Sequence, residues 1–165
     1  LTLVKNAKDK GALIIYDPNI RNSHHLENHK LMQAVFENIK LSSIIKGSDE
    51  DFMNIFGTSD TLSQIDEIRK LNSDAPIIIT KGSAGILCDI NRIQLKLPSI
   101  ETEIVSTIGA GDAFSAGIIY GIKSFNVKTR HQLSDHIEAI LNCGLQFSAQ
   151  VCNSLDNYIS QIKVG

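Results

Sequence analysis

The residues with the clearest chemical potential lie at 106–114, with the sequence STIGAGDAF. Two glycines flank an alanine where an apolar helix is expected to begin, so backbone N–H groups can converge on one point with no side chain in the way. The N–H groups of a first helical turn and the positive end of the helix dipole favour an anion such as a phosphate. This stretch therefore predicts an anion site.

Asp112 falls in the first turn of that expected helix. A carboxylate at this position is open to two interpretations. It either stabilises the helix start by its interaction with the dipole, or it accepts the proton of a substrate hydroxyl that attacks a phosphorus held beside it. The residue types and their spacing allow both.

The string TIGAGDAF at 107–114 resembles the C-terminal signature of the ribokinase-like (pfkB family) carbohydrate kinases. The resemblance implies ATP-dependent phosphoryl transfer to a sugar, with Asp112 as the catalytic base. It also implies that the anion hole for the phosphoryl group is formed by Gly109, Ala110 and Gly111.

A second candidate element, DPNIR at 17–21, follows an apolar run at 12–16 that predicts a buried strand. By itself Asp-Pro-Asn indicates a turn, although open α/β sheets bind ligands at the carboxyl ends of their strands. The element resembles the D-x-N-x-R sequence of fructokinase-like and ketodeoxygluconate-kinase-like members of the family. That resemblance implies contacts of Asn19 and Arg21 with the sugar or with phosphate groups.

Residues 48–51 predict a capped helix start, with Ser48 as the N-cap and Asp51 as the third helical residue. They also fall where the family carries N-x-x-E, a motif that organises the water shell of the Mg²⁺ ion on the nucleotide. Ser48 replaces the Asn and Asp51 replaces the Glu, so the resemblance implies a Mg²⁺ contact of Asp51 through water. Ser106 stands where many members have an Asp that helps hold a monovalent cation, which puts potassium activation in doubt.

Two further elements resemble the nucleotide site of the family. Thr80, Gly82 and Gly85 follow a predicted strand at 76–80 with T-x-G-x-x-G spacing. A plain β-turn is the alternative, while the resemblance implies that the three residues border the nucleotide. Asn142 precedes small residues in a predicted helix at 131–152, where a close helix crossing is the structural interpretation and an adenine pocket is the one that the resemblance implies.

Histidines and cysteines favour no metal site. His24, His25 and His29 are close together, but no Asp, Glu or Cys partner shows ligand spacing, so we expect a solvated loop and helix start. The cysteines are widely spaced with no C-x-x-C pair, which indicates buried, reduced thiols at Cys88, Cys143 and Cys152.

Composition is typical of one soluble domain, with 165 residues, 42% hydrophobic and 21% charged. The formal net charge of -2 and the lack of a dense Lys/Arg cluster argue against nucleic acid or a membrane surface as partners. No apolar run reaches transmembrane length and no signal-peptide pattern opens the chain, so we expect a cytoplasmic protein.

Apolar runs and helical stripes alternate along the chain and predict an α/β fold with a doubly wound, mostly parallel sheet and a β-hairpin region. Leu62, Ile65, Ile68 and Leu71 are expected to face inward from a helix at 60–71. Expected strands lie at 12–16, 41–46, 76–80, 86–88 and 93–97, and other helices at 3–10, 26–40, from the glycine turn to about 125, 131–152 and 154–163.

The resemblance covers the chain but only the C-terminal half of the family's length. Residues 1–165 are therefore expected to be the nucleotide-binding half of a ribokinase-like domain, without the N-terminal half and lid and inactive on its own. Sugar and ATP are the implied partners, and the full-length form is expected to be a homodimer. Two alternatives stay open: a nucleoside kinase of the same family, and a non-catalytic nucleotide-binding fragment.

Overall fold

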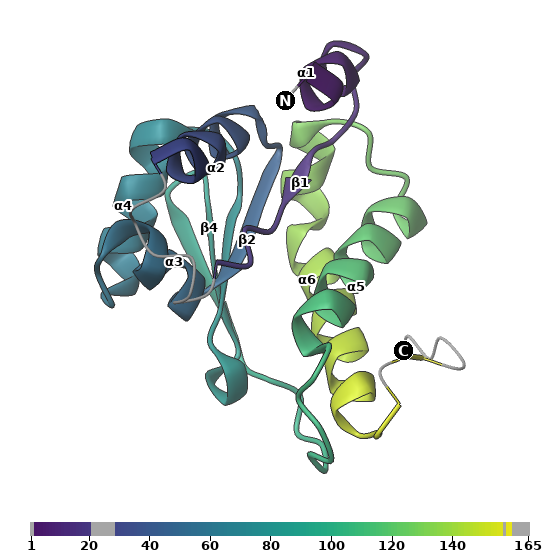
Figure 1. Cartoon of the computed structure of the whole chain (residues 1–165). Helices are drawn as coiled ribbons and strands as arrows, with labels where there is room; N and C mark the ends of the chain where they lie inside the picture. The colour runs from purple at the N-terminus through teal and green to yellow at the C-terminus, as the bar shows by residue number, and fades with distance from the viewer. Residues whose placement is uncertain (1, 21–28, 157, 160–165) are drawn as a thin grey trace. The chain divides into compact units, whose positions relative to one another are not determined.

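The computed structural model describes residues 2–20, 29–156 and 158–159, and the chain divides into two compact units, residues 1–97 and 98–165 (Figure 1). In chain order, the elements of the first unit are α1 (Thr2–Asp9), β1 (Ile15–Tyr16), α2 (His29–Leu41), β2 (Ile44–Ser48), α3 (Asp49–Phe56), α4 (Thr61–Leu71), β3 (Ile77–Thr80), the short 3-10 helix η2 (Gly82–Ala84), β4 (Ile86–Ile90) and β5 (Ile93–Leu97).

The five strands form one sheet in the order β1-β2-β3-β4-β5. β1 pairs with β2 and β2 with β3 in parallel, whereas β3 pairs with β4 and β4 with β5 antiparallel. The α/β class is confirmed, but the prediction of a mostly parallel sheet is wrong because the sheet is mixed. Helices connect the parallel strands, whereas the connections 81–85 and 91–92 are too short for a crossover and allow only antiparallel hairpins.

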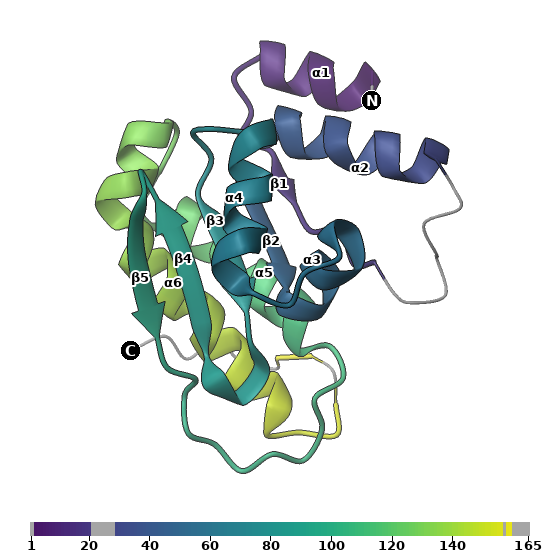
Figure 2. The ribbon, with the colours of Figure 1, turned by 90° about the vertical axis from the view of Figure 1, so that its left-hand side faces the viewer.

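Helices α2, α3 and α4 cover one face of this sheet (Figure 2). β-branched strand residues suit this position, since they pack well on a pleated surface. The buried residues of the core between helices and sheet are Val35, Ile39, Ile45, Phe52, Ile55, Ile65, Ile68, Ala75, Ile77, Ile79 and Leu87.

Three details of the first unit differ from expectation. β1 has only two residues, and both are half-buried, because this edge strand pairs with β2 alone in the described sheet. Leu62 is 50% exposed, since the buried stripe of α4 begins with Gln64 and Ile65 one turn into the helix. The strand expected at 41–46 lies at Ile44–Ser48 instead, because α2 continues to Leu41.

The second unit is built on two long helices, α5 (Ala110–Ser124) and α6 (Arg130–Cys152), which confirm the two expected helices. They cross closely through small residues. An added Cβ at Gly117 would lie 2.5 Å from the Cys143 carbonyl oxygen, and one at Gly144 would lie 2.8 Å from the Phe114 ring. The helix crossing thus accounts for Cys143 and Gly144 in the apolar stripe of α6.

The expected helix at 154–163 is wrong for its described part, because residues 154–156 and 158–159 are not helical. α6 ends at Cys152, and beyond it the Asn153 side chain donates a hydrogen bond to the Thr102 hydroxyl at 2.9 Å. Among the described helices, none is long and apolar enough to cross a membrane.

The three cysteines are free, and Cys88 and Cys143 are buried as predicted, whereas the predicted burial of Cys152 is wrong because it is half-buried at the end of α6. Burial raises the pKa of the Cys88 thiol to about 12, with the neighbouring Asp89 charge adding to the effect. Burial also raises the pKa of Cys143. The described residues contain no group of three or more His, Cys, Asp or Glu placed to hold a metal ion, and His24 and His25 lie outside the described residues.

Candidate functional site

The N-cap position of α5 requires a glycine. Gly109 is the N-cap residue, with φ +81° and ψ -1°, a left-handed conformation that an L-residue adopts only with strain. Its carbonyl oxygen accepts the first helical hydrogen bond, from Ala113 N–H at 2.8 Å. Because Gly109 has no side chain, nothing at the cap position covers the amides of the first turn.

The first amide of this turn is engaged within the chain. Ala110 N–H donates to the Thr107 carbonyl oxygen at 3.2 Å. Gly111 and Asp112 occupy the next two helical positions. The anion role of the turn stays a prediction.

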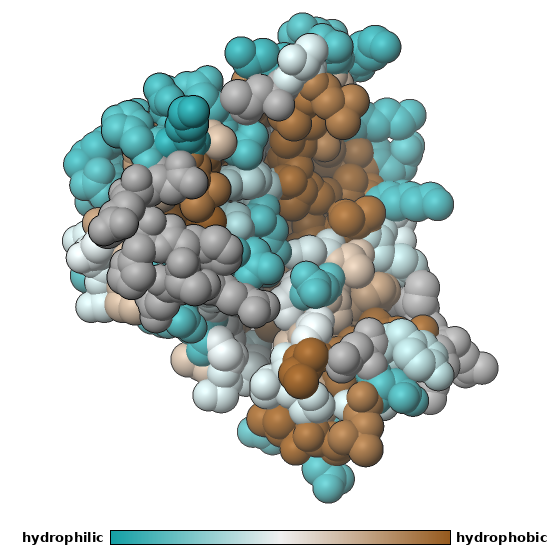
Figure 3. Space-filling view, in the orientation of Figure 1, coloured by the Kyte–Doolittle hydropathy of each residue, from teal (hydrophilic) through white to brown (hydrophobic). Residues whose placement is uncertain are grey.

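The Asp112 side chain is exposed in this first turn. It does not point into packed protein, so it stands where a ligand can reach it. Beside it, the preceding loop exposes apolar side chains: Ile104 is 63% exposed and Ile108 69% exposed, and brown surface gathers over this loop at the lower end of Figure 3. The turn thus combines a carboxylate, first-turn amides and apolar surface.

The loop that leads into the turn is held by the C-terminal end of α6. Val105 N–H and Ser106 N–H both donate to the Cys152 carbonyl oxygen, at 2.8 and 3.2 Å. The Ser106 hydroxyl in turn accepts from Ile108 N–H at 3.3 Å. Sequence reasoning missed this anchor, since nothing in the spacing of residues 105 and 152 indicates that they meet.

Asn142 lies on α6, apart from the turn. Its neighbours Cys143 and Gly144 are buried at the helix crossing, whereas Asn142 itself is exposed. Cys143 lies opposite Gly117, which is more than one helical turn along α5 from Asp112. The second unit therefore does not bring Asn142 and Asp112 into contact, and the adenine role of Asn142 stays a prediction.

In the first unit, the parallel strands bring three predicted elements to one edge of the sheet. Asn19 follows β1, Asp51 follows β2, and Thr80 ends β3, with Thr80 paired to Ser48 in register. The carboxyl ends of parallel strands are where open α/β sheets bind ligands. Arg21 lies outside the described residues.

The turn after β3 has the conformation predicted for a glycine-rich strand end. Gly82 and Gly85 have φ values of +54° and +85°, and Lys81 N–H donates to the Gly85 carbonyl at 2.8 Å. The Thr80 hydroxyl donates to the Gly47 carbonyl at 3.4 Å, linking β3 to β2. Both glycines are therefore required by the turn, whatever ligand it borders.

Asp51 forms the predicted capping box with Ser48: its Oδ2 accepts from Ser48 N–H at 2.9 Å and from the Ser48 hydroxyl at 2.6 Å. Its Oδ1 accepts from Ile20 N–H at 2.8 Å, a contact that the sequence did not indicate. Two neighbouring residues were also missed: Lys46 pairs with Asp17 at 2.7 Å, and Asn54 donates to the Ile20 carbonyl at 2.9 Å. The spacing of Asp51 and Asn54, which places both on one helix face, was the available signal.

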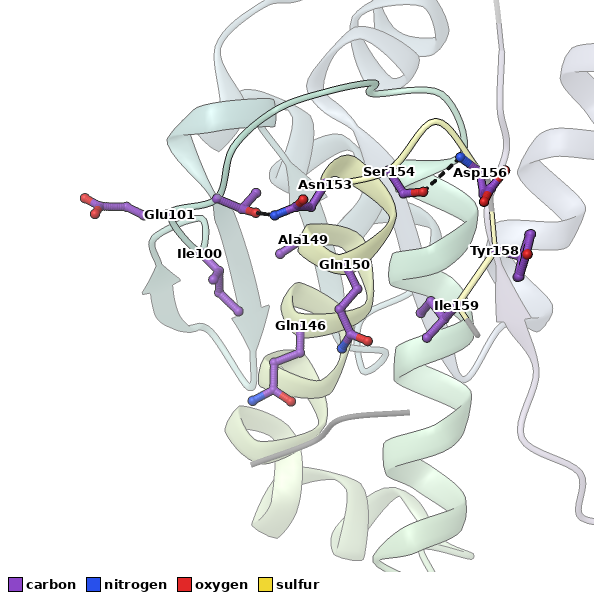
Figure 4. Close-up of a pocket in the computed structure, with 11 residues that line it drawn as sticks. Ile100, Glu101, Gln146, Ala149, Gln150, Asn153, Ser154, Asp156, Tyr158 and Ile159 are labelled. Atoms are coloured by element: carbon purple, nitrogen blue, oxygen red, sulfur yellow. Dashed lines mark hydrogen bonds between the residues drawn. The ribbon is translucent and has the colours of Figure 1, made fainter. Parts of the chain in front are cut away.

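A separate pocket of about 520 Å³ lies at the C-terminal end of α6 (Figure 4). Gln146, Gln150 and Asn153 line it from α6 and its end, and Glu101 and Asp156 add two carboxylates. Its described lining includes no Lys or Arg and none of the predicted site residues, so its charge does not suit a nucleotide phosphate.

The sheet and the helices that connect its parallel strands define an α/β protein. The sequence model of the "pfkB family carbohydrate kinase" family matches residues 1–161, so the chain belongs to the pfkB family of carbohydrate kinases. Among curated relatives, a fructokinase of Escherichia coli is 26% identical over 87% of this chain and 46% of its own length. A fructokinase of Rhizobium leguminosarum bv. trifolii is 33% identical over 80% of the chain and 40% of its own length.

Solved structures share the fold. A fructokinase double mutant from Vibrio cholerae O395, "in fructose, ADP and potassium ion bound form", matches 94% of this chain and 49% of its own with a TM-score of 0.80 and 20% identity. Aminoimidazole riboside kinase from Salmonella enterica, "complexed with aminoimidazole riboside and ATP analog", matches 92% of this chain and 50% of its own with a TM-score of 0.78 and 23% identity. The chain spans about half the length of the relatives that it matches.

Proposed function

We propose that residues 1–165 form the C-terminal, nucleotide-binding half of an ATP-dependent sugar kinase whose acceptor is a sugar hydroxyl, as in a fructokinase. The observation that carries the proposal is the exposed Asp112 carboxylate in the first turn of α5, three residues after the left-handed Gly109. Membership of the pfkB family and the fructokinase names of several relatives favour the sugar acceptor.

In the proposed reaction, Asp112 accepts the proton of the sugar hydroxyl as its oxygen attacks the γ-phosphorus of ATP, and ADP leaves on the opposite side. First-turn amides at Gly109, Ala110 and Gly111 stabilise negative charge on the transferred group. Thr80, Gly82 and Gly85 border the nucleotide, Asn142 lies near adenine, and Asn19 and Arg21 contact the sugar or phosphate.

Magnesium is the expected counter-ion of the ATP phosphates. The described residues offer no cluster of three acidic or thiol ligands, and the Asp51 carboxylate already accepts three hydrogen bonds. This donor set fits a hydrated Mg²⁺ held mainly by phosphate oxygens, because the hydrogen bonds of the Asp51 carboxylate are already used within the protein. When bound, the ion neutralises phosphate charge. A potassium requirement is not proposed, because Ser106 has no charge.

The proposal is tested with two proteins: the chain itself, and a chimeric enzyme in which the N-terminal half of the E. coli fructokinase precedes it. ATP affinity is measured by calorimetry and turnover by coupled ADP release. We expect the chain to bind ATP without turning over, and the chimeric enzyme to phosphorylate fructose. Asp112→Asn should lower turnover by about 10²–10⁴-fold, the usual contribution of a general base, with little change in ATP affinity.

Glu103→Gln is the matched control, because Glu103 is an exposed carboxylate in the loop before the turn. It should leave both turnover and ATP affinity close to those of the unmodified protein. Equal losses of turnover and ATP affinity in Asp112→Asn would contradict the role of Asp112 as a base.

A nucleoside kinase is the second candidate, favoured by the likeness to aminoimidazole riboside kinases. A screen of the chimeric enzyme over fructose, ribose, ketodeoxygluconate, adenosine and aminoimidazole riboside separates the two. Turnover with a nucleoside and none with a sugar would replace the sugar acceptor. ATP binding without turnover on any of these acceptors would favour a non-catalytic nucleotide-binding protein.

A further inference from the structure

Both backbone hydrogen-bonding groups of Ile20 are held by side chains of α3. Asp51 Oδ1 accepts from Ile20 N–H at 2.8 Å, and Asn54 Nδ2 donates to the Ile20 carbonyl at 2.9 Å. Such a pair of bonds fixes the position and the direction of one peptide segment. Neither bond is needed to complete a strand or a helix, because Ile20 lies in a loop.

Packing against the core fixes α3, which carries both side chains. Asp51 and Asn54 are three residues apart and therefore share one helix face. The buried Phe52 and Ile55 fix the other face in the core, where an added Cβ at Gly47 would lie 2.8 Å from the Phe52 ring. Ser48 donates from both its amide and its hydroxyl to Asp51 Oδ2, which holds the carboxylate in place.

The other end of the same loop is anchored to β2. Lys46 is only 5% exposed, and its ammonium nitrogen lies 2.7 Å from Asp17 Oδ2. The segment from Asp17 to Ile20 is thus tied at its start to β2 and at its end to α3. Between these two contacts, Asn19 has φ +43°. This left-handed conformation has a backbone energy cost and persists only where the surrounding structure holds it.

We propose that Asp51 and Asn54 are positioning residues that fix the Ile20 backbone, and so hold Asn19 in the conformation that presents its side chain to the phosphoryl acceptor. The acceptor role of Asn19 rests on the proposed kinase function, whereas the fixing of Ile20 does not. In this proposal Asp51 acts through a hydrogen bond, for which a neutral acceptor is sufficient, and its negative charge is not required.

Amide hydrogen exchange of the ¹⁵N-labelled chain, followed by NMR, measures the contact directly. In Asp51→Ala, Ile20 N–H should exchange at least ~10-fold faster relative to Ile79, a buried β3 residue, since its acceptor is lost. Asp51→Asn keeps an oxygen acceptor and should restore most of the protection. Glu50→Ala is the matched control, because it removes an exposed carboxylate from the same helix start and leaves the Ile20 contact.

The second readout is the KM of the chimeric enzyme for each substrate. Asn54→Ala and Asp51→Ala should raise the KM for the acceptor by about 10-fold, as expected for a loss of about 1.4 kcal/mol, with a much smaller change in the KM for ATP. Glu50→Ala, at an exposed position of the same helix, should change neither. A variant that unfolds is recognised by the loss of Ile79 protection.

An unchanged exchange rate of Ile20 N–H in Asp51→Ala would overturn the proposal that Asp51 fixes the Ile20 backbone. If Asp51→Asn were as impaired as Asp51→Ala, mainly in the KM for ATP, the charge would be required and a Mg²⁺ role would replace positioning. If the chimeric enzyme turned over no acceptor, the kinase function and the acceptor role of Asn19 would fail together. The exchange data would still decide whether Asp51 and Asn54 hold Ile20.

Discussion

Gly117 of α5 passes so close to Cys143 of α6 that an added Cβ atom would lie 2.5 Å from the Cys143 carbonyl oxygen and 2.7 Å from the Gly144 Cα. All of these neighbours are backbone atoms, so they cannot move aside as a flexible side chain can. The helix that carries Asp112 therefore packs on α6 at a distance that only glycine permits.

Gly117→Ala should destabilise the second unit by about 1–3 kcal/mol, the usual cost of overpacking, although helix propensity alone would favour alanine by about 1 kcal/mol. Urea unfolding followed by circular dichroism measures the difference. Gly121→Ala is the matched control, because its Cβ would lie 3.1 Å from the Ile140 Cα and should cost less. A more stable Gly117→Ala protein would show that the helices can separate freely.

Gly109→Ala should weaken ATP binding, because alanine at φ +81° costs about 1–2 kcal/mol and the turn would shift to relieve that strain. Gly57→Ala is the matched control: Gly57 has φ +72° and space around its Cβ, but it ends α3 and is not part of the turn. Both variants should lose similar stability, and only Gly109→Ala should lose ATP affinity in calorimetry. Equal ATP affinities would contradict the anion role of the turn.

The buried ion pair between Arg69 and Asp89 joins α4 to β4. Arg69 Nε donates to Asp89 Oδ1 at 2.9 Å, and its Nη1 donates to the Ala75 carbonyl at 2.6 Å. Arg69→Met should destabilise the chain by about 3–5 kcal/mol, because Asp89, only 4% exposed, would keep a buried charge without its partner. In urea unfolding, the double variant Arg69→Met/Asp89→Leu should recover much of this loss. A double variant as unstable as the single one would show that the carbonyl contacts of Arg69 matter more than the charge pair.

The raised pKa of the buried Cys88 thiol predicts that the folded chain loses stability at alkaline pH. Burial raises the pKa of its thiol from 9.0 to about 12, so in the folded state it remains protonated between these values while the unfolded chain ionises. The contribution is complete below about pH 9 and falls as the pH rises towards 12, by up to about 1.4 kcal/mol per pH unit. Urea unfolding at pH 7.5 and 10 should show a smaller loss in Cys88→Ala than in the unmodified chain.

Cys152→Ala, at a half-buried position, is the control and should keep the full pH dependence. The same alkaline loss in Cys88→Ala would assign it to other groups, among them Tyr16, whose pKa is also raised by burial.

Local chemistry in the sequence was sufficient for several features. The capping box of Ser48 and Asp51, the helix start after Gly109, and the Asn91-Arg92 turn with φ values of +51° and +65° all depend on residues close in the chain. The exposed position of Asp112 in the first turn of α5 follows from the same local rules. The sequence TIGAGDAF at 107–114 likewise indicated membership of the pfkB family, which is confirmed over residues 1–161.

Only the tertiary structure decided which distant groups meet. Ile20 and Asp51 are 31 residues apart. The Cys152 carbonyl oxygen accepts hydrogen bonds from Val105 N–H and Ser106 N–H, although two helices separate these residues in the sequence. These contacts are made by backbone groups, which every residue carries, so no residue type in the sequence indicates them. The mixed sheet likewise followed from connection lengths and strand pairing, since an apolar strand has the same pattern whichever way its neighbour runs.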